Sequence, residues 1–257
     1  MADEILCTID DGVATLTLNR PEKRNAMNTA VLDGLRRSFD ELDEDRDVRV
    51  VVVRGAGTAF CSGMDLNEMS VKQREAADPE TGVTAVLQRI ERSPHPTIAM
   101  VHGDAYAGGC ELALHCDLRI AADVVRFAMP LARIGLVVPF PLGQKLVEIV
   151  GPAWAREILL VGRPVDARRA LEMGMVHRVV PAADVETVTY EIARAIAGNA
   201  PLSLAGMKTL IRRSISPREG IGHADLDAEV TRARKSADAR EGVRAMLEKR
   251  RPNFTGQ

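Results

Sequence analysis

Two glycine-containing loops hold the residues whose types and spacing are best suited to chemistry. They cover residues 55–66 and 102–112, and each follows a predicted buried strand. Glycine lets a backbone turn sharply and approach a ligand closely. Because the second loop opens a predicted helix, free N–H groups with partial positive charge should face out of it. One N–H from each loop could therefore point at a single oxygen, which is what an oxyanion hole requires. Ordinary strand-to-helix turns are the alternative explanation of these glycines.

Glu111 falls in the first turn of the helix that we expect to begin at Gly108. Leu112, Ala113 and Leu114 follow it directly, so this helix should be largely buried. A carboxylate in apolar surroundings needs either a partner or a function. A carboxylate favoured by the helix N-terminus, or one on a solvated surface, would be the purely structural alternatives.

Other chemistries lack their motifs in this chain. It contains no GxxxxGK[ST], no GxGxxG that opens a helix after a strand, and no GxSxG elbow. Nucleotide cradles and serine hydrolases of those types are therefore disfavoured. His115 lies one helical turn from Glu111, but no second His or Cys pair completes a ligand set. We therefore expect no metal, and we expect His115 to hydrogen-bond Glu111 or the backbone.

The composition limits the class of protein. Of 257 residues, 46% are hydrophobic and 27% are charged, the balance of a soluble globular protein. Thirty-four Lys and Arg against 36 Asp and Glu give a net charge of -2, so no bulk basic field favours nucleic acid. No stretch reaches the roughly 18 apolar residues of a membrane-spanning helix. We expect a cytoplasmic protein with no nucleic-acid or membrane partner and with reduced, mostly buried cysteines. The cysteines are Cys7, Cys61, Cys110 and Cys116.

The remaining pattern predicts an α/β fold with mainly parallel strands. Residues 5–9 and 13–18 flank an Asp-Gly turn, which indicates a hairpin. Residues 29–46 carry apolar side chains at three- and four-residue spacing, which indicates an amphipathic helix. Further strands are expected over residues 48–53, 97–101 and 118–121.

From about Pro152 onward the pattern becomes helical. Prolines stand near the expected helix starts, where proline is tolerated. Helices are expected over residues 153–161, 166–173, 183–197, 202–214, 223–237 and 240–250. We expect a core over residues 1–195, followed by a helical segment, 196–257, for packing and oligomerisation.

Five blocks of sequence occur together in a recognisable order. They are NRPEKRNAMN (19–28), AFCSGMDL (59–66), AGGCELA (107–113) with CDL (116–118), ALEMGMV (170–176) with VVP (179–181), and EKRRPNF (248–254). With these blocks the chain resembles the crotonase family, the enoyl-CoA hydratase/isomerase superfamily, from about Ile5 to its tail. The resemblance implies a core of repeated ββα units and C-terminal helices that mediate homotrimers, often paired into homohexamers. It also implies an acyl-CoA substrate, with coenzyme A as part of the substrate and no separate cofactor.

The resemblance also implies roles for particular residues. The backbone N–H groups of Met64 and Gly108 match the two oxyanion donors, and Glu111 matches an acid/base group. The positions that match ligand-binding residues are Arg24, Ala26, Gly63, Asp65, Leu66 and Lys249. Arg24 and Lys249 match positions near the ligand's phosphates, with Lys249 reaching from a neighbouring subunit. Solvated surface cations are the alternative explanation of both.

One departure from the family pattern concerns the second acid. Hydratases of this family use two glutamates around one water, and the second position here is Leu131. A third position, used by the dienoyl-CoA isomerase branch, aligns near Pro139. Neither side chain can carry a proton, and losing an acid/base group typically costs about 10²–10⁴ in rate.

Three hypotheses remain from the sequence. The first is an enzyme with Glu111 as its sole acid/base group, acting by hydration or a proton shift. Its variant is decarboxylation of a malonyl-type thioester, because the methylmalonyl-CoA decarboxylase branch resembles this pattern of one retained acid. The second is a non-catalytic acyl-CoA binder, and the third is a scaffold unrelated to CoA, which would require the five blocks to be coincidence. Hydration or isomerisation ranks first because it is the family's most populated chemistry. Residues 69–82 are expected to cap the acyl pocket.

Overall fold

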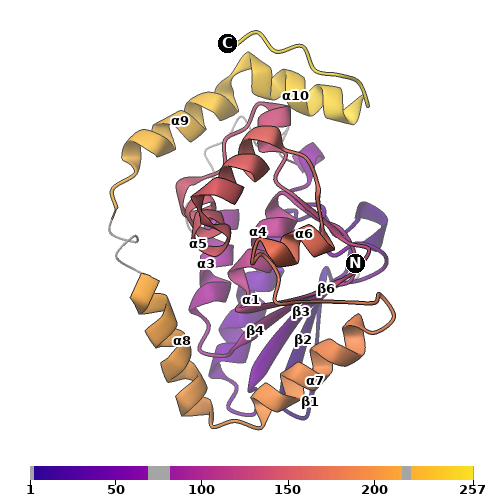
Figure 1. Ribbon diagram of the computed structural model, residues 1–257, viewed down its shortest axis with the longest axis vertical. Helices are drawn as coiled ribbons and strands as arrows, with labels where there is room; N and C mark the ends of the chain where they lie inside the picture. Colours follow the sequence, from indigo (N-terminus) through magenta and orange to yellow (C-terminus); the bar gives the residue numbers. More distant parts are fainter. Residues whose placement is uncertain (1–2, 69–81, 216–220, 257) are drawn as a thin grey trace.

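A six-stranded sheet forms the centre of the computed structural model, which describes residues 3–68, 82–215 and 221–256 (Figure 1). The cap was expected over residues 69–82, and all of these except Gly82 lie outside the described residues. The strand order is β1-β2-β3-β4-β6-β9. The strands are β1 (Ile5–Asp10), β2 (Val13–Leu18), β3 (Val50–Gly55), β4 (Thr97–Val101), β6 (Leu118–Ala122) and β9 (Arg178–Val180).

The strand pairing confirms the predicted α/β class. β1 and β2 form an antiparallel hairpin, and every later neighbour in this sheet pairs in parallel. Asp11 and Gly12 occupy the hairpin turn with φ of 46° and 76°, which is the backbone that an Asp-Gly turn favours. β3 and β4 are almost entirely buried, as expected of central parallel strands.

A second, smaller sheet gives the core its repeated pattern. It consists of β5 (Ala105–Tyr106), β7 (Arg126–Ala128) and β8 (Val165–Asp166). β4 leads into β5 and then α4 (Gly108–His115), while β6 leads into β7 and later α5 (Phe140–Arg156). After β3, Cys61 forms an isolated bridge with Ala105 of β5. Each central strand thus sends its following loop to the same small sheet.

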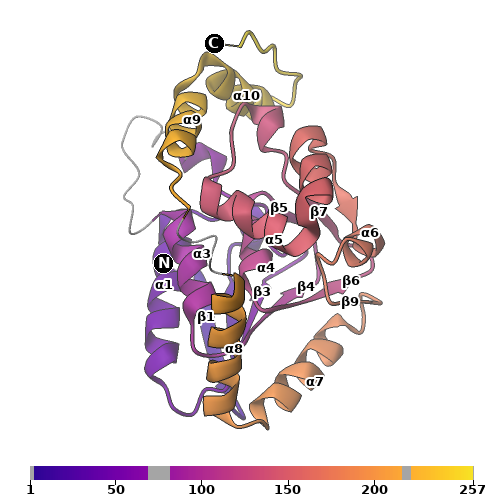
Figure 2. The same cartoon turned by 60° about the vertical axis from the view of Figure 1, so that its left-hand side comes forward.

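Helices cover both faces of the main sheet. α1 (Thr29–Glu44) contacts β1 and β2, and α7 (Val185–Ala197) contacts β3, β4 and β6. Figure 2 shows the sheet between them. α3 (Val83–Arg92) packs against both α1 and α4, and α4 packs on α5. The shorter elements are α6 (Ala167–Glu172), the 3₁₀ turns η1 (Pro21–Lys23) and η2 (Leu131–Ile134), and the π-helical η3 (Glu157–Val161).

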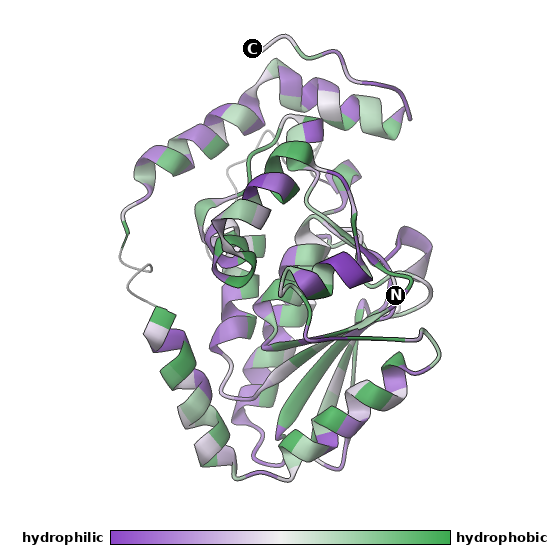
Figure 3. Ribbon diagram, viewed as in Figure 1, coloured by the Kyte–Doolittle hydropathy of each residue, from purple (hydrophilic) through white to green (hydrophobic). Residues whose placement is uncertain are grey.

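Three C-terminal helices run around the outside of the core (Figure 1). They are α8 (Pro201–Ile215), α9 (Ala224–Lys235) and α10 (Ala237–Leu247). α8 and α9 have no fully buried residue, whereas α10 packs on η2. Figure 3 shows hydrophobic residues interspersed along α8 and α9. Among the described residues, no helix is long and apolar enough to cross a membrane.

The structure corrects the sequence prediction in several places. α3 and the short strands β5, β7, β8 and β9 were not predicted, and β8 and β9 interrupt the part expected to be wholly helical. The helix expected over residues 153–161 is present as the last four residues of α5 followed by η3, whereas the part of α5 before Gly151 was not predicted. Gly151, with φ of 74° and ψ of 166°, separates these two parts. Cys7 is exposed, while Cys61, Cys110 and Cys116 are buried, and all four are free thiols.

Candidate active site

The two glycine loops meet through backbone hydrogen bonds. Tyr106 N–H donates to Cys61 O at 2.9 Å, and Cys61 N–H donates to Asp104 O at 3.2 Å. On its other side, the first loop pairs with Met27, whose N–H donates to Gly63 O at 2.7 Å. These contacts place residues 61–65 between the segment after η1 and the start of α4.

The amides of Met64 and Gly108 lie close together at this junction. A Cβ added to Gly108 would lie 3.6 Å from Met64 N, and one added to Gly63 would lie 3.2 Å from Gly108 N. Met27 O accepts from the N–H of Asp65 at 2.8 Å, so the Met64 N–H points away from Met27. Neither N–H donates a hydrogen bond to another described residue. Two adjacent amides without acceptors are suited to bind one oxygen.

Unusual backbone conformations make this close approach possible. Ala107, just before α4, has φ of 47° and ψ of -118°, which is rare for a residue with a Cβ. Gly63 has φ of 96°. A Cβ on Gly109 would lie only 2.1 Å from Cys61 O. Such strained backbone persists only where the surrounding structure enforces it, often at functional sites.

Glu111 is an isolated, buried acid. Its exposed fraction is 1%, and neither carboxyl oxygen has a hydrogen-bond partner among the described residues. Burial raises the pKa of this carboxyl well above its ordinary value, while the charge of Lys145 acts in the opposite direction. Burial thus shifts this carboxyl toward its protonated form. The expectation of a buried carboxyl at this position is confirmed.

His115 is a neutral neighbour of Glu111. Burial lowers the pKa of its imidazole to about 4, so its approach of 3.8 Å to Glu111 Oε2 is not an ion pair at neutral pH. Its Nδ1–H donates to the carbonyl oxygen of Glu111 at 2.8 Å, since a carbonyl can only accept. The expected hydrogen bond of His115 to Glu111 or the backbone is confirmed.

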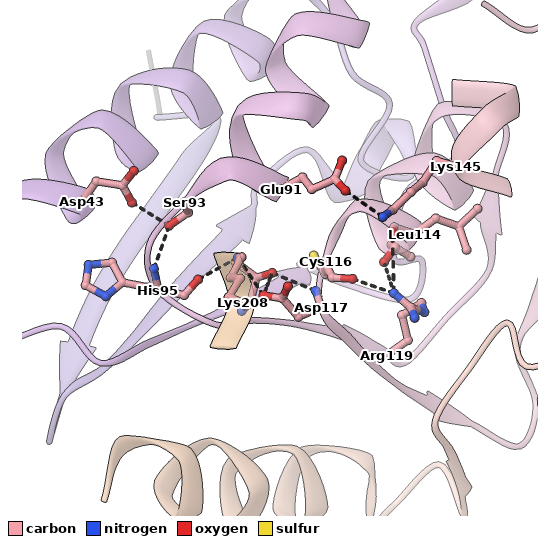
Figure 4. Close-up of polar contacts among 12 residues, drawn as sticks. Asp43, Glu91, Ser93, His95, Leu114, Cys116, Asp117, Arg119, Lys145 and Lys208 are labelled. Carbon is pink, nitrogen blue, oxygen red and sulfur yellow. Dashed lines mark hydrogen bonds and ion pairs between the residues drawn. The ribbon is translucent and has the colours of Figure 1, made fainter. Parts of the chain in front are cut away.

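A half-buried ion cluster lies next to His115 of α4. Lys145 Nζ contacts Glu91 Oε1 at 2.7 Å and Glu148 Oε1 at 2.9 Å, and Figure 4 shows the first of these pairs. Glu91, Lys145, Glu148 and His115 also line a cavity of about 50 Å³. Sequence reasoning missed Lys145, and no motif signalled it, because its partner Glu91 comes from a distant helix.

Four of the expected ligand-binding residues come together. Ser62 N–H donates to Arg24 O at 3.0 Å, and Arg24 itself is exposed. Arg20 donates to Ala26 O at 2.6 Å and contacts Asp65 Oδ2 at 3.2 Å. Arg20 therefore links the segment after η1 to the loop that follows Gly63 through these two contacts. Sequence reasoning missed it, although it stands in the block 19–28 and has a charge opposite to that of Asp65.

The other candidate positions are more scattered. Leu66 is half-buried directly after Asp65. Lys249 is exposed beyond α10 with φ of 55°, and its N–H donates to Met246 O. Leu131 opens η2 and packs half-buried against the core, while Pro139 precedes α5. Across the described ranges, no group of three or more His, Cys, Asp or Glu could hold a metal ion.

Comparison with known proteins identifies the family to which this fold and this site belong. Residues 8–257 match the model of the enoyl-CoA hydratase/isomerase family. The chain belongs to this family and is an enzyme of it.

Individual relatives cover the chain from end to end. It is 34% identical to the 1,2-epoxyphenylacetyl-CoA isomerase of Escherichia coli strain K12 over 100% of both chains. It is 33% identical to the 2,3-dehydroadipyl-CoA hydratase of the same organism over 99% of both. A solved methylmalonyl-CoA decarboxylase complexed with 2-nitronate-propionyl-CoA shares 27% identity, with a TM-score of 0.88 over 98% of both chains. The expected crotonase-like fold is confirmed.

Proposed function

We propose that this chain converts an acyl-CoA through a thioester enolate, held between the N–H groups of Met64 and Gly108, with Glu111 as its only acid/base group. The observation that carries this proposal is the pair of adjacent amides that have no acceptor among the described residues, with a buried carboxyl that lacks a hydrogen-bond partner there too, three residues along α4 from Gly108. The relatives named above support a CoA thioester as the substrate class, because their names say that those proteins act on or bind such thioesters.

The chemistry follows from charge development. A thioester that gains an electron pair at its α-carbon places negative charge on its carbonyl oxygen. Two fixed N–H donors stabilise that charge, and each is typically worth about 10²–10³ in rate. Glu111 stands three residues after Gly108, on the same helix, to take or give a proton. Coenzyme A is part of the substrate, so the proposal needs no separate cofactor.

The direction of the pKa shift at Glu111 favours a second candidate reaction, decarboxylation of a malonyl-type thioester. Burial raises the pKa of this carboxyl, and a raised pKa favours the form that donates a proton over the form that activates water. The bond from the α-carbon to the carboxylate would break, CO₂ would leave, and the electron pair would remain as the enolate. Glu111 would then donate its proton to the α-carbon and recover one from water.

Mass spectrometry in D₂O distinguishes these reactions. Crotonyl-CoA and methylmalonyl-CoA would each be incubated with the protein. Hydration would add D₂O to crotonyl-CoA, a proton shift would add deuterium alone, and decarboxylation would give deuterated propionyl-CoA with loss of CO₂. We expect at least one of these products. Tight binding of both thioesters without any product would contradict the proposal and favour a non-catalytic acyl-CoA binder.

The pH dependence of the observed rate gives an independent check. Hydration needs ionised Glu111, so its kcat should rise with pH through the raised pKa. Decarboxylation needs protonated Glu111, so its kcat should fall over the same range. A rate that is flat across this range would argue against Glu111 as the proton carrier in either reaction.

The proposal extends to assembly as a homotrimer or homohexamer through the segment 196–257. On α8, Leu202, Met207, Leu210 and Ile211 are 62–89% exposed, and such an apolar face is favourable to bury. Light scattering should give a mass of three or six chains, and Leu210→Asp should reduce it. A wild-type monomer at micromolar concentration would contradict this assembly.

A further inference from the structure

The two catalytic groups proposed above share one short helix. α4 spans Gly108–His115 and presents the Gly108 N–H at its first residue and Glu111 in its first turn. Seven of its eight residues are buried among the surrounding elements, so a contact that sets the position of one end of the helix also affects the other end. The end opposite to the catalytic groups therefore matters for where those groups lie.

Arg119 holds that opposite end. Its Nη1 donates to Cys116 O at 2.5 Å, with longer contacts to Leu114 O at 3.4 Å and Ala113 O at 3.5 Å. Its Nε donates to Met175 O at 2.7 Å, in the segment just before β9. Figure 4 shows the guanidinium directed at the backbone of Leu114 and Cys116. One planar group thus ties the last carbonyls of α4 to a different part of the fold.

The buried guanidinium of Arg119 has backbone carbonyls as its hydrogen-bond partners instead of a carboxylate. The side chain is 5% exposed and forms no ion pair with any residue in the described ranges. Burial lowers the pKa of its guanidinium, but arginine remains charged in proteins. Its hydrogen-bond acceptors are all backbone carbonyls, three of them at the negative end of the α4 dipole. A buried charge that is shared between the last carbonyls of a helix and Met175 O links that helix end to the segment before β9.

We propose that Arg119 is a positioning residue that holds α4 at the angle where Gly108 N–H and Glu111 meet the Met64 N–H. This inference rests on the proposed function of those three groups. Eight residues at 1.5 Å each make α4 about 12 Å long, so a tilt of about 5° at its C-terminus moves its N-terminus by about 1 Å. A misplacement of that size typically costs about 10²-fold in rate.

The test is Arg119→Lys, with Arg89→Lys as its matched control. Lysine keeps the positive charge but cannot reproduce the planar fork that reaches both Cys116 O and Met175 O. Arg89 bridges α3 to Asp40 and Asp43 of α1 and donates to Phe39 O, without contacting the α4 carbonyls. For Arg119→Lys we expect kcat to fall about 10–100-fold and KM to change less than about threefold. Arg89→Lys should keep both constants.

The readouts separate positioning from folding. Each kcat is measured well below the Tm of the variant, on the thioester that the wild type converts. A lowered Tm with unchanged kcat would assign Arg119 a structural role only and overturn the proposal. If the wild type converts no thioester, the proposed function fails, and hydrogen exchange then decides the positioning role. Faster exchange confined to residues 107–116 in Arg119→Lys would support it, and unchanged exchange there would overturn it.

Discussion

Replacing Glu111 with Gln is expected to lower turnover of the acyl-CoA that the wild type converts by about 10²–10⁴-fold. Gln keeps the shape of the side chain but cannot exchange a proton at neutral pH. We expect no other acid to take over, because the positions that the family resemblance assigns to the second and third acids hold Leu131 and Pro139. KM should change little, since the amides of Met64 and Gly108 remain. The check is steady-state kinetics of the two proteins, and an unchanged kcat would remove Glu111 from the mechanism.

The same variant should be more stable than the wild type, which separates lost chemistry from lost folding. The pKa of Glu111 is raised by burial in the folded chain. Such a group contributes its full stability below its unfolded pKa of about 4.3, and this contribution is lost as pH rises toward the folded pKa. Gln does not titrate, so its advantage should grow with pH to about 0.5–2 kcal/mol.

Thermal unfolding at several pH values measures this difference. Glu44→Gln provides the control, because Glu44 is exposed at the end of α1 and its replacement should leave the pH dependence of Tm nearly unchanged. A Glu111→Gln protein that is less stable than the wild type at alkaline pH would show that the carboxylate has an unrecognised partner.

The sequence predicted those parts of the fold that have a strong local signal. The Asp-Gly turn and the valine run of β3 determine their own backbone, and both lie where expected. β9 has three residues, none of them fully buried, so its strand character comes from pairing with β6 and not from its own pattern. The same holds for the two-residue strands β5 and β8.

The sequence predicted only those features of the site that lie within a single short segment. Glycines after strands and a carboxyl beside an apolar run indicated an oxyanion loop and a buried acid. The residues that hold these pieces together act across long separations in the chain. Arg20 contacts Asp65 45 residues later, and Arg119 reaches Met175 56 residues later. The spacing of apolar residues along one sequence contains no information on contacts between distant segments.

Replacing Gly63 with Ala is expected to lower kcat by about 10²–10³-fold, the usual effect of losing one oxyanion donor. Gly63 has φ of 96°, which a residue with a Cβ rarely adopts. Its added Cβ would lie 2.9 Å from Tyr106 O and 3.2 Å from Gly108 N. Neither neighbour is a flexible side-chain end, so the backbone itself must shift. Because Met64 is the next residue, its N–H moves away from that of Gly108.

Gly198→Ala is the matched control for this change. Gly198 follows α7 with φ of -73°, and a Cβ there would meet its nearest atom at an ordinary 3.6 Å. Its kcat should equal that of the wild type. For Gly63→Ala, kinetics well below the Tm should show the loss in kcat while the bound fraction of a non-reactive acyl-CoA falls only modestly. Full activity in a folded Gly63→Ala protein would mean that the substrate carbonyl does not depend on these two amides, because a Cβ 2.9 Å from Tyr106 O requires the backbone next to them to shift.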